Sequence, residues 1–224
     1  MIFRLVIFMS LFGFIFGCSK GPYKNEGINT IYNLLFCDNT ELYLNKCQEP
    51  EIYPWDIVLS KKSSVDDLRK IINDINLESR VKILAYNELR NRKIAINNKE
   101  LLGIIIEIGF DKGLDVLAAY KDGTARYINQ SGKLIVWDVN DNKSDPIVKE
   151  LFLHGENVIS NIGPWEKPRL PYPEKGMARM TFLVSDGLYF GQGPKGVLFE
   201  DKMGRPVLDA GTKLMQYLIE KASN

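Results

Sequence analysis

The stretch that decides the fold is residues 101–139, which read LLGIIIEIGFDKGLDVLAAYKDGTARYINQSGKLIVWDV. Its first part, 101–110, is almost all apolar and β-branched in the middle, which is typical of a short, buried strand. Turn signals containing glycine follow at 111–113, 122–123 and 131–132. The stretch therefore predicts an antiparallel meander, with strands near 101–110, 114–121, 124–130 and 133–139.

The Asp122-Gly123 pair gives the sharpest prediction of strand register. Such a pair is typical of a two-residue turn, in which both central residues need a positive φ. If Ser131-Gly132 forms the same turn, Ala119 faces Arg126 in the first hairpin, and Arg126 faces Trp137 in the second. We therefore expect the Arg126 guanidinium or its aliphatic stem to cover the Trp137 indole.

Amphipathic helices are predicted on both sides of the meander. Ser64 and Asp67 form a capping-box pattern before apolar residues at helical spacing, and Asn76 is placed to cap a second helix. Asp145-Pro146 predicts a helix start with Asp145 as the N-cap, and Gly204-Arg205-Pro206 opens the last helix.

A second small group of strands is predicted after the meander. Residues 177–184 and 188–191 have strand patterns, and 196–199 is a candidate for a third strand. The whole pattern predicts a single α+β domain over 31–222, an antiparallel sheet covered by amphipathic helices. The order of elements loosely resembles the profilin and roadblock arrangements, a resemblance that implies no function.

The beginning of the chain has the features of an export signal. Arg4 precedes an apolar run from Leu5 to Gly17, which is too short to span a bilayer. The run ends in Ile15-Phe16-Gly17-Cys18, which resembles a bacterial lipobox except at Phe16, where a small residue is usual. The resemblance implies that 1–17 is removed and that Cys18 carries fatty acyl chains. An ordinary signal peptide or an uncleaved anchor with an incidental cysteine is the alternative.

Residues 18–30 are polar and contain glycine and proline, which predicts a tether between the lipid and the domain. Ser19 is not the aspartate that often retains lipoproteins in an inner membrane, which weakly favours an outer membrane where one is present. Residues 31–59 lack periodicity and predict an irregular lead-in packed on the domain.

Charge and cysteine content narrow the class of protein further. The 224 residues include 29 Lys and Arg against 28 Asp and Glu, so the net charge is too small to attract nucleic acid. In an oxidising compartment Cys37 and Cys47 are expected to pair, with two buried thiols as the alternative. His154, the single histidine, is the only other soft donor, so the sequence predicts no metal site and no cofactor.

Several residues deserve a functional interpretation beside a structural one. Glu107 interrupts the most apolar strand and shares a face with Leu101, Gly103, Ile105 and Gly109 by alternation. In an apolar site its raised pKa suits a general acid, although a carboxylate there more often lies on a wetter face or pairs with a base.

Two other motifs favour structural interpretations. His154 is expected at the edge of the core and bonded to backbone. Residues 191–196 match G-x-G-x-x-G but precede a strand-like segment, so we interpret them as a glycine-rich connection between strands rather than a dinucleotide site.

The loop 163–176 contains four prolines and predicts a stiff crossover. Its Trp165, Arg169 and Tyr172 suit a surface for a protein partner in the envelope, with simple packing over the sheet as the alternative.

Two stretches, GLDVLAAYKDGTARYINQSG at 113–132 and FLVSDGLYFG at 182–191, resemble an uncharacterised group of bacterial proteins, over about residues 80–220. The resemblance brings no activity or ligand. We therefore expect an exported, lipid-anchored envelope protein with a binding or structural role. A periplasmic hydrolase acting through a carboxylate such as Glu107 is one alternative, and an immunity or secretion-accessory lipoprotein is another.

Overall fold

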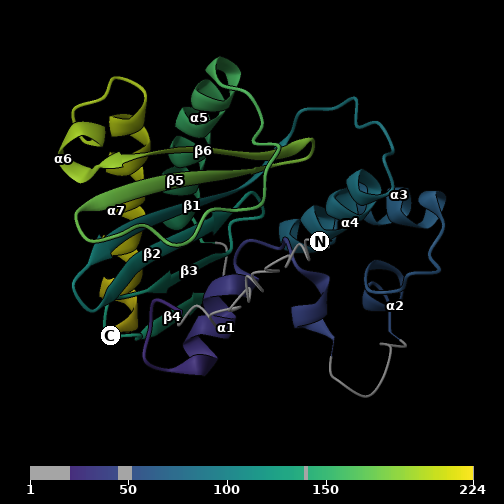
Figure 1. Cartoon of the computed structure of the whole chain (residues 1–224), viewed down its shortest axis with the longest axis horizontal. Helices are drawn as coiled ribbons and strands as arrows, with labels where there is room; N and C mark the ends of the chain where they lie inside the picture. The colour runs from purple at the N-terminus through teal and green to yellow at the C-terminus, as the bar shows by residue number, and fades with distance from the viewer. Residues whose placement is uncertain (1–20, 45–51, 139–140, 224) are drawn as a thin grey trace, which may run out of the picture.

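One six-stranded antiparallel sheet organises the molecule, in the strand order β4-β3-β2-β1-β5-β6 (Figure 1). The computed structural model describes residues 21–44, 52–138 and 141–223. The strands are β1 (Leu101–Phe110), β2 (Gly113–Tyr120), β3 (Ala125–Ile128), β4 (Leu134–Trp137), β5 (Met177–Val184) and β6 (Gly187–Pro194). The α+β single domain and the four-strand meander are therefore confirmed. The second group of strands continues the same sheet, because β5 pairs with β1.

The register of the meander differs from the prediction. Arg126 pairs with Ala118 and with Val136, whereas Trp137 pairs with Ala125. Neighbouring residues of a strand point to opposite faces, so Arg126 and Trp137 lie on opposite faces and the predicted contact was wrong. The Arg126 guanidinium instead forms an ion pair with the Asp138 carboxylate at 2.6 Å.

Three-residue loops cause this shift. The loops span 121–123 and 130–132. The Tyr120 N–H donates to the Thr124 carbonyl at 2.9 Å across the first loop, and the Asn129 N–H donates to the Lys133 carbonyl at 3.0 Å across the second. Gly123 and Gly132 occupy the last loop position with φ of 89° and 85°, the left-handed conformation that this kind of loop needs. Each glycine thus ends a three-residue loop instead of completing a two-residue turn.

Two long helices, α5 (Ser144–Asn161) and α7 (Gly204–Ala222), cover one face of the sheet side by side. Glycine allows α7 to lie close, because a Cβ on Gly211 would stand 2.3 Å from Cδ1 of Ile106. The predicted start of α7 is confirmed. Helix α5 begins one residue before Asp145, and the Asp141 carboxylate accepts the Ser144 N–H at 2.6 Å. The prediction of Asp145 as its cap was therefore wrong.

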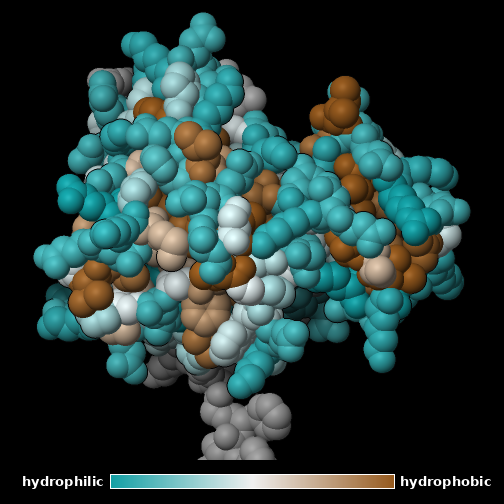
Figure 2. Space-filling view, turned by 90° about the horizontal axis from the view of Figure 1, so that it is seen from above, coloured by the Kyte–Doolittle hydropathy of each residue, from teal (hydrophilic) through white to brown (hydrophobic). Residues whose placement is uncertain are grey.

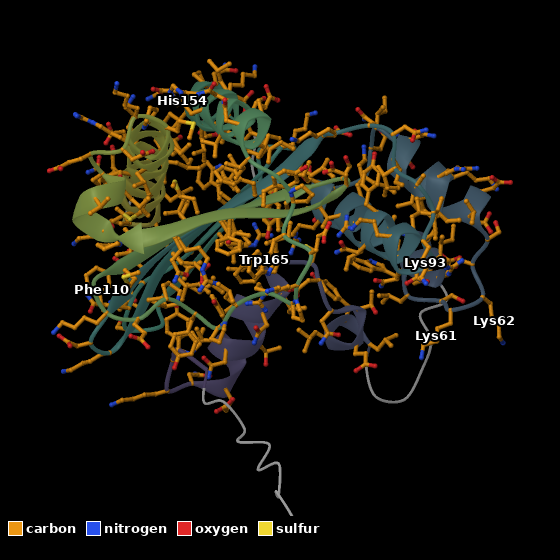
Figure 3. All side chains as sticks on the ribbon, turned by 45° about the horizontal axis from the view of Figure 1, so that its top comes forward. Lys61, Lys62, Lys93, Phe110, His154 and Trp165 are labelled. Atoms are coloured by element: carbon orange, nitrogen blue, oxygen red, sulfur yellow. The ribbon has the colours of Figure 1, made fainter. Side chains whose placement is uncertain are left out.

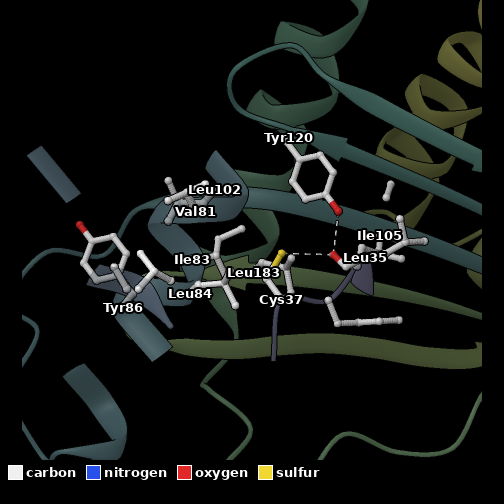
Figure 4. Packing of buried hydrophobic residues seen from close by; sticks show 14 of the residues in the cluster. Leu35, Cys37, Val81, Ile83, Leu84, Tyr86, Leu102, Ile105, Tyr120 and Leu183 are labelled. Atoms are coloured by element: carbon white, nitrogen blue, oxygen red, sulfur yellow. Dashed lines mark hydrogen bonds between the residues drawn. The ribbon is translucent and has the colours of Figure 1, made fainter. Parts of the chain in front are cut away.

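The other face is covered by α1 (Glu26–Leu34), η1 (Thr40–Tyr43), α2 (Trp55–Val58), α3 (Val65–Asn73) and α4 (Ser79–Asn91). The Ser64–Asp67 capping box is confirmed. Helix α4 starts later than predicted, with Glu78 as its N-cap, because Asn76 instead lies in a turn and donates its N–H to Asp74. Figure 4 shows the core on this side, where the Tyr120 hydroxyl donates to the Leu35 carbonyl at 2.7 Å.

Regular structure begins earlier in the chain than predicted, within the segment that was expected to be a tether. Helix α1 begins at Glu26, and Tyr23 is already buried, with its hydroxyl donating to the Leu114 carbonyl at 3.0 Å. Two aromatic side chains of α1 and its end, Tyr32 and Phe36, enter the core. The Asn25 side chain caps α1 by accepting the Gly27 N–H at 2.8 Å, a local signal that the prediction of a tether missed. Burial on the sheet then stabilises a helix too short to form alone.

Two smaller differences concern the ends of strands. Residues 195–198 form a single helical turn, α6 (Lys195–Leu198), so the candidate strand at 196–199 is absent. A register shift in β1 between Leu101 and Gly103 turns Leu101 toward α5 and α7. Leu101 therefore does not share the face of Glu107, contrary to the prediction from alternation.

Apolar side chains gather on the surface of the part formed by α2, α3 and α4 (Figure 2). Ile52 and Ile75 are the most exposed large apolar side chains of the described residues, at 75% and 90%. Within residues 21–44, 52–138 and 141–223, no helix is both long enough and apolar enough to cross a bilayer.

The predicted export signal, Cys18 and Cys47 lie outside the described residues, so lipidation and the Cys37–Cys47 disulfide stay predictions. Cys37 itself is fully buried, and the Tyr43 hydroxyl lies 3.5 Å from its Sγ. Burial raises the pKa of the Cys37 thiol to about 12.

Candidate functional site: a hollow beside the proline-rich loop

The loop 163–176 crosses the sheet and is fixed at both ends. Near its start, the Trp165 N–H donates to the Leu188 carbonyl of the edge strand β6 at 2.7 Å. At its end, the Gly176 N–H donates to the Gly109 carbonyl of β1 at 3.0 Å. Gly109 is required there, because a Cβ would stand 2.0 Å from the Glu174 carbonyl oxygen. The loop therefore lies across the face of the sheet that carries Glu107, and hydrogen bonds to β6 and β1 hold its two ends.

A buried cluster holds the middle of this loop against the sheet. Glu107 on β1 and Arg179 on β5 are direct neighbours, with Glu107 Oε2 and Arg179 Nη1 3.7 Å apart. Arg179 Nη1 donates to the Leu170 carbonyl at 3.2 Å, and its Nη2 donates to the Pro171 carbonyl. The Tyr32 hydroxyl of α1 donates to Glu107 Oε1 at 2.6 Å. The cluster therefore joins α1, two central strands and the loop.

The electrostatics of Glu107 follow from its position. Burial raises the pKa of its carboxyl, while the Arg179 guanidinium and the Tyr32 hydroxyl act in the opposite direction. Glu107 is 0% exposed, and Oε2 has no hydrogen-bond partner among the described residues. The Glu107 carboxyl therefore does not reach solvent in this structure. The alternative interpretation, pairing with a base, is the one the structure supports.

Arg169 lies on the outer side of the same loop and connects it to the end of α1. Its Nε lies 2.8 Å from the Asp38 carboxylate, and its Nη2 donates to the Asn33 carboxamide at 2.9 Å. The guanidinium carbon stands 3.8 Å from the centre of the Phe36 ring, which supports its flat face. The Arg169 guanidinium is therefore held in one orientation by three side chains of the N-terminal segment.

These contacts enclose the rim of an open hollow of about 550 Å³, which we call the loop hollow. Its walls come from α1 and the residues around it on one side, and from 169–172 on the other. Its lining includes Tyr32, Asn33, Asp38, Asn39, Arg169 and Tyr172. A second hollow of about 590 Å³ shares Asp38 and Arg169 with the first and extends to Trp165. The Asp38–Arg169 ion pair thus stands between two hollows along one loop.

The three residues predicted as a partner surface are divided by this arrangement. Arg169 and Tyr172 line the loop hollow, whereas Trp165 lines the second hollow and not the first. The Trp165 ring packs edge-on against Phe190 at 5.0 Å, and its Nε1 donates to the Pro168 carbonyl at 3.0 Å. Trp165 therefore anchors the loop to the edge of the sheet as well as lining a surface.

The sequence interpretation missed Asp38 and Asn33. Both lie in a segment that was predicted as an irregular lead-in, and Asp38 contacts a residue 131 positions away. No local pattern in the chain connects those two positions.

The remaining candidates lie elsewhere. His154 lies on α5, on the opposite side of the sheet from Trp165 in Figure 3, with its Nε2 4.0 Å from the Glu150 carboxylate. Residues 191–194 pair with β5 and 195–198 form α6, so the G-x-G-x-x-G match joins a strand to a short helical turn and not to another strand. Within the described ranges, no group of three His, Cys, Asp or Glu side chains is placed to hold a metal ion.

Comparisons with known proteins provide no identity for this arrangement. No protein-family model, no curated protein and no solved structure matches the chain.

Proposed function

We propose that the protein is an exported, lipid-anchored component of the bacterial cell envelope, whose folded domain binds a ligand or protein partner at the loop hollow. The observation that carries the binding role is the loop hollow itself, with a rim held by the Arg179 hydrogen bond to Leu170 and by the close packing of Gly109. Binding to a preformed rim costs less conformational entropy than binding to a loop that must first be ordered.

The anchoring role rests on the predicted export signal, residues 1–17, and on Cys18 after it. Removal of 1–17 takes away one of the 29 basic residues and none of the 28 acidic ones, so the mature chain has no net charge. A neutral protein has no electrostatic attraction to an anionic bilayer, so acyl chains on Cys18 supply the attachment. An immunity or secretion-accessory lipoprotein belongs to the same class and differs only in its partner.

A binding role is favoured over a hydrolase. The carboxylate that interrupts the apolar strand, Glu107, is sealed beneath α1 and the loop. His154 lies on α5, on the other face of the sheet, with its Nε2 4.0 Å from the Glu150 carboxylate.

The anchor is tested by labelling cells with an alkyne analogue of a fatty acid. The full-length protein should take up label, and Cys18→Ala should not. Equal labelling of the two proteins would show that Cys18 is not the lipid attachment site.

The binding face is tested by photo-crosslinking in the envelope. A photoreactive amino acid replaces Tyr172 in the loop hollow, or Leu153, which is 65% exposed on α5 across the sheet, as the matched control. Adducts should form from position 172 and not from 153. Identical adducts from both positions, or none from 172, would refute the assignment of this face.

A further inference from the structure

The loop hollow lies close to the point where the proposed lipid anchor joins the domain. Gly21 and Pro22 are part of its lining. Three residues of extended chain span about 11 Å at most, so Cys18 and Gly21 cannot be further apart than this. If Cys18 carries lipid, as the proposed function states, the loop hollow is tethered within reach of the lipid headgroups.

The charges of the loop hollow are one anion and one cation. Among the residues that line it, Asp38 and Arg169 are the only charged side chains, and they lie 2.8 Å apart. Their side chains are 31% and 19% exposed, so both can be reached from the hollow. A ligand that complements them carries a negative and a positive charge a few ångströms apart and no net charge.

The surrounding groups refine this chemistry. The Phe36 ring holds the Arg169 guanidinium in place, and Arg169 Nη1 donates no hydrogen bond to another residue of the described part of the chain. A fixed guanidinium with an available N–H is suited to a phosphate oxygen. The Asp38 carboxylate and the ring of Tyr172, which is 38% exposed in the lining, are suited to an ammonium group.

We propose that the loop hollow binds the phosphoethanolamine headgroup of a bilayer lipid, with the phosphate on Arg169 and the ammonium on Asp38. The ligand replaces the contact between these two side chains with two contacts of the same kind. Partly exposed ion pairs are weak, so this exchange has a small cost. A phosphoglycerol headgroup has no ammonium and leaves the Asp38 carboxylate facing a phosphate, so it should bind less well.

The test uses the mature, lipidated protein purified in detergent and titrated calorimetrically. The probes are glycerophosphoethanolamine, which carries both charges, glycerophosphoglycerol, which lacks the ammonium, and inorganic phosphate. We expect saturable binding of the first probe and about ten-fold weaker binding of the other two, the loss of one charge-assisted contact. Nanodiscs with and without phosphatidylethanolamine then distinguish the sources, because only a lipid-derived ligand competes with the soluble probe in the disc.

Three variants make the result specific to the site. Arg169→Gln should weaken binding of glycerophosphoethanolamine by about ten-fold or more. Asp38→Asn should abolish the preference for glycerophosphoethanolamine over glycerophosphoglycerol, while both probes still bind through their phosphate groups. Misfolding would not produce this change, because it would abolish binding of both probes. Arg205→Gln, at an exposed ion pair on α7, is the matched control and should change nothing.

The outcomes separate this proposal from the proposed function. No saturable binding, equal binding of both glycerophosphodiesters, or full binding by Arg169→Gln overturns the headgroup site, even where labelling confirms the anchor. Selective binding in detergent supports the site even where Cys18 proves to be unlabelled.

Discussion

Replacing Arg179 with methionine should destabilise the protein strongly, because it leaves a buried carboxylate without its cation. Arg179 is 2% exposed, and its guanidinium reaches Gln192 at 2.7 Å, the carbonyls of Leu170 and Pro171, and Glu107. Methionine occupies a similar volume and makes none of these contacts. The change therefore removes the polar link between the loop and the sheet.

The magnitude follows from the distance and the burial. Unit charges 3.7 Å apart attract by about 4 kcal/mol at an effective dielectric constant of about 20, before desolvation is subtracted. Desolvation cancels much of this energy in the intact pair, but a single unpaired buried charge keeps its penalty. We expect Arg179→Met to lower the free energy of unfolding by about 3–5 kcal/mol at pH 7. Adding Glu107→Gln should restore about 1–3 kcal/mol of that loss.

The assay is urea unfolding followed by circular dichroism, with the two single variants and the double variant forming a cycle. Arg205→Met, at a pair whose side chains are 65% and 51% exposed, should change stability by less than about 0.5 kcal/mol.

Burial raises the pKa of Glu107 above the ordinary value of 4.5, so the folded state binds its proton more tightly than the unfolded state. Stability from this group is present below pH 4.5 and lost as the pH rises through the folded pKa. The Arg179 guanidinium lowers this pKa, so its loss raises the pKa of Glu107 further, and the deficit of Arg179→Met should shrink in acid. A deficit below about 1 kcal/mol at pH 7, or strict additivity in the cycle, would refute the reasoning.

Three further outcomes are expected. Gly109→Ala should detach the end of the loop or destabilise the protein by about 1–3 kcal/mol, because its Cβ would stand 2.0 Å from the Glu174 carbonyl oxygen; a native melting temperature contradicts this. Hydrogen bonds from Tyr217 and the Ser144 N–H lower the pKa of Asp141, so the stability it contributes is present above pH 3.8 and lost as the pH falls below it. Tyr217→Phe should therefore flatten the acid limb of the stability profile, and an unchanged limb argues against the bond. Peptide mapping without reductant should recover Cys37 linked to Cys47, whereas two free thiols in exported protein would exclude the disulfide.

Local chemistry explains which elements could be predicted from the sequence. The capping box at Ser64 and Asp67 acts within four residues, and the apolar run 101–110 marks a central strand wherever it lies. The proline-rich loop was recognisable because its prolines oppose both helix and strand. The hairpin register was wrong because Asp122-Gly123 is compatible with loops of two or three residues. The choice between them moves every side chain to the other face.

The candidate site was only partly predictable. Arg169 and Tyr172 could be selected because an exposed aromatic and basic loop is unusual. Their partner Asp38 could not be selected, because it lies 131 positions away from Arg169 and only the packing of α1 on the sheet brings the two together. The partner of Glu107 could not be predicted either. Its sequence context suggested a carboxylate in an apolar site, but no local pattern showed that Arg179 would lie beside it.

The sequence by itself determined the α+β class, the meander, the proline-rich crossover and the expectation of export, since each depends on residues close together in the chain. The tertiary structure alone decided that Glu107 faces Arg179, that Asp38 meets Arg169, and that the loop hollow lies beside Gly21. Those contacts depend on which strands become neighbours and on where α1 is buried. Both are set by the packing of the whole core, in which many distant residues are buried together, and no short segment carries that information.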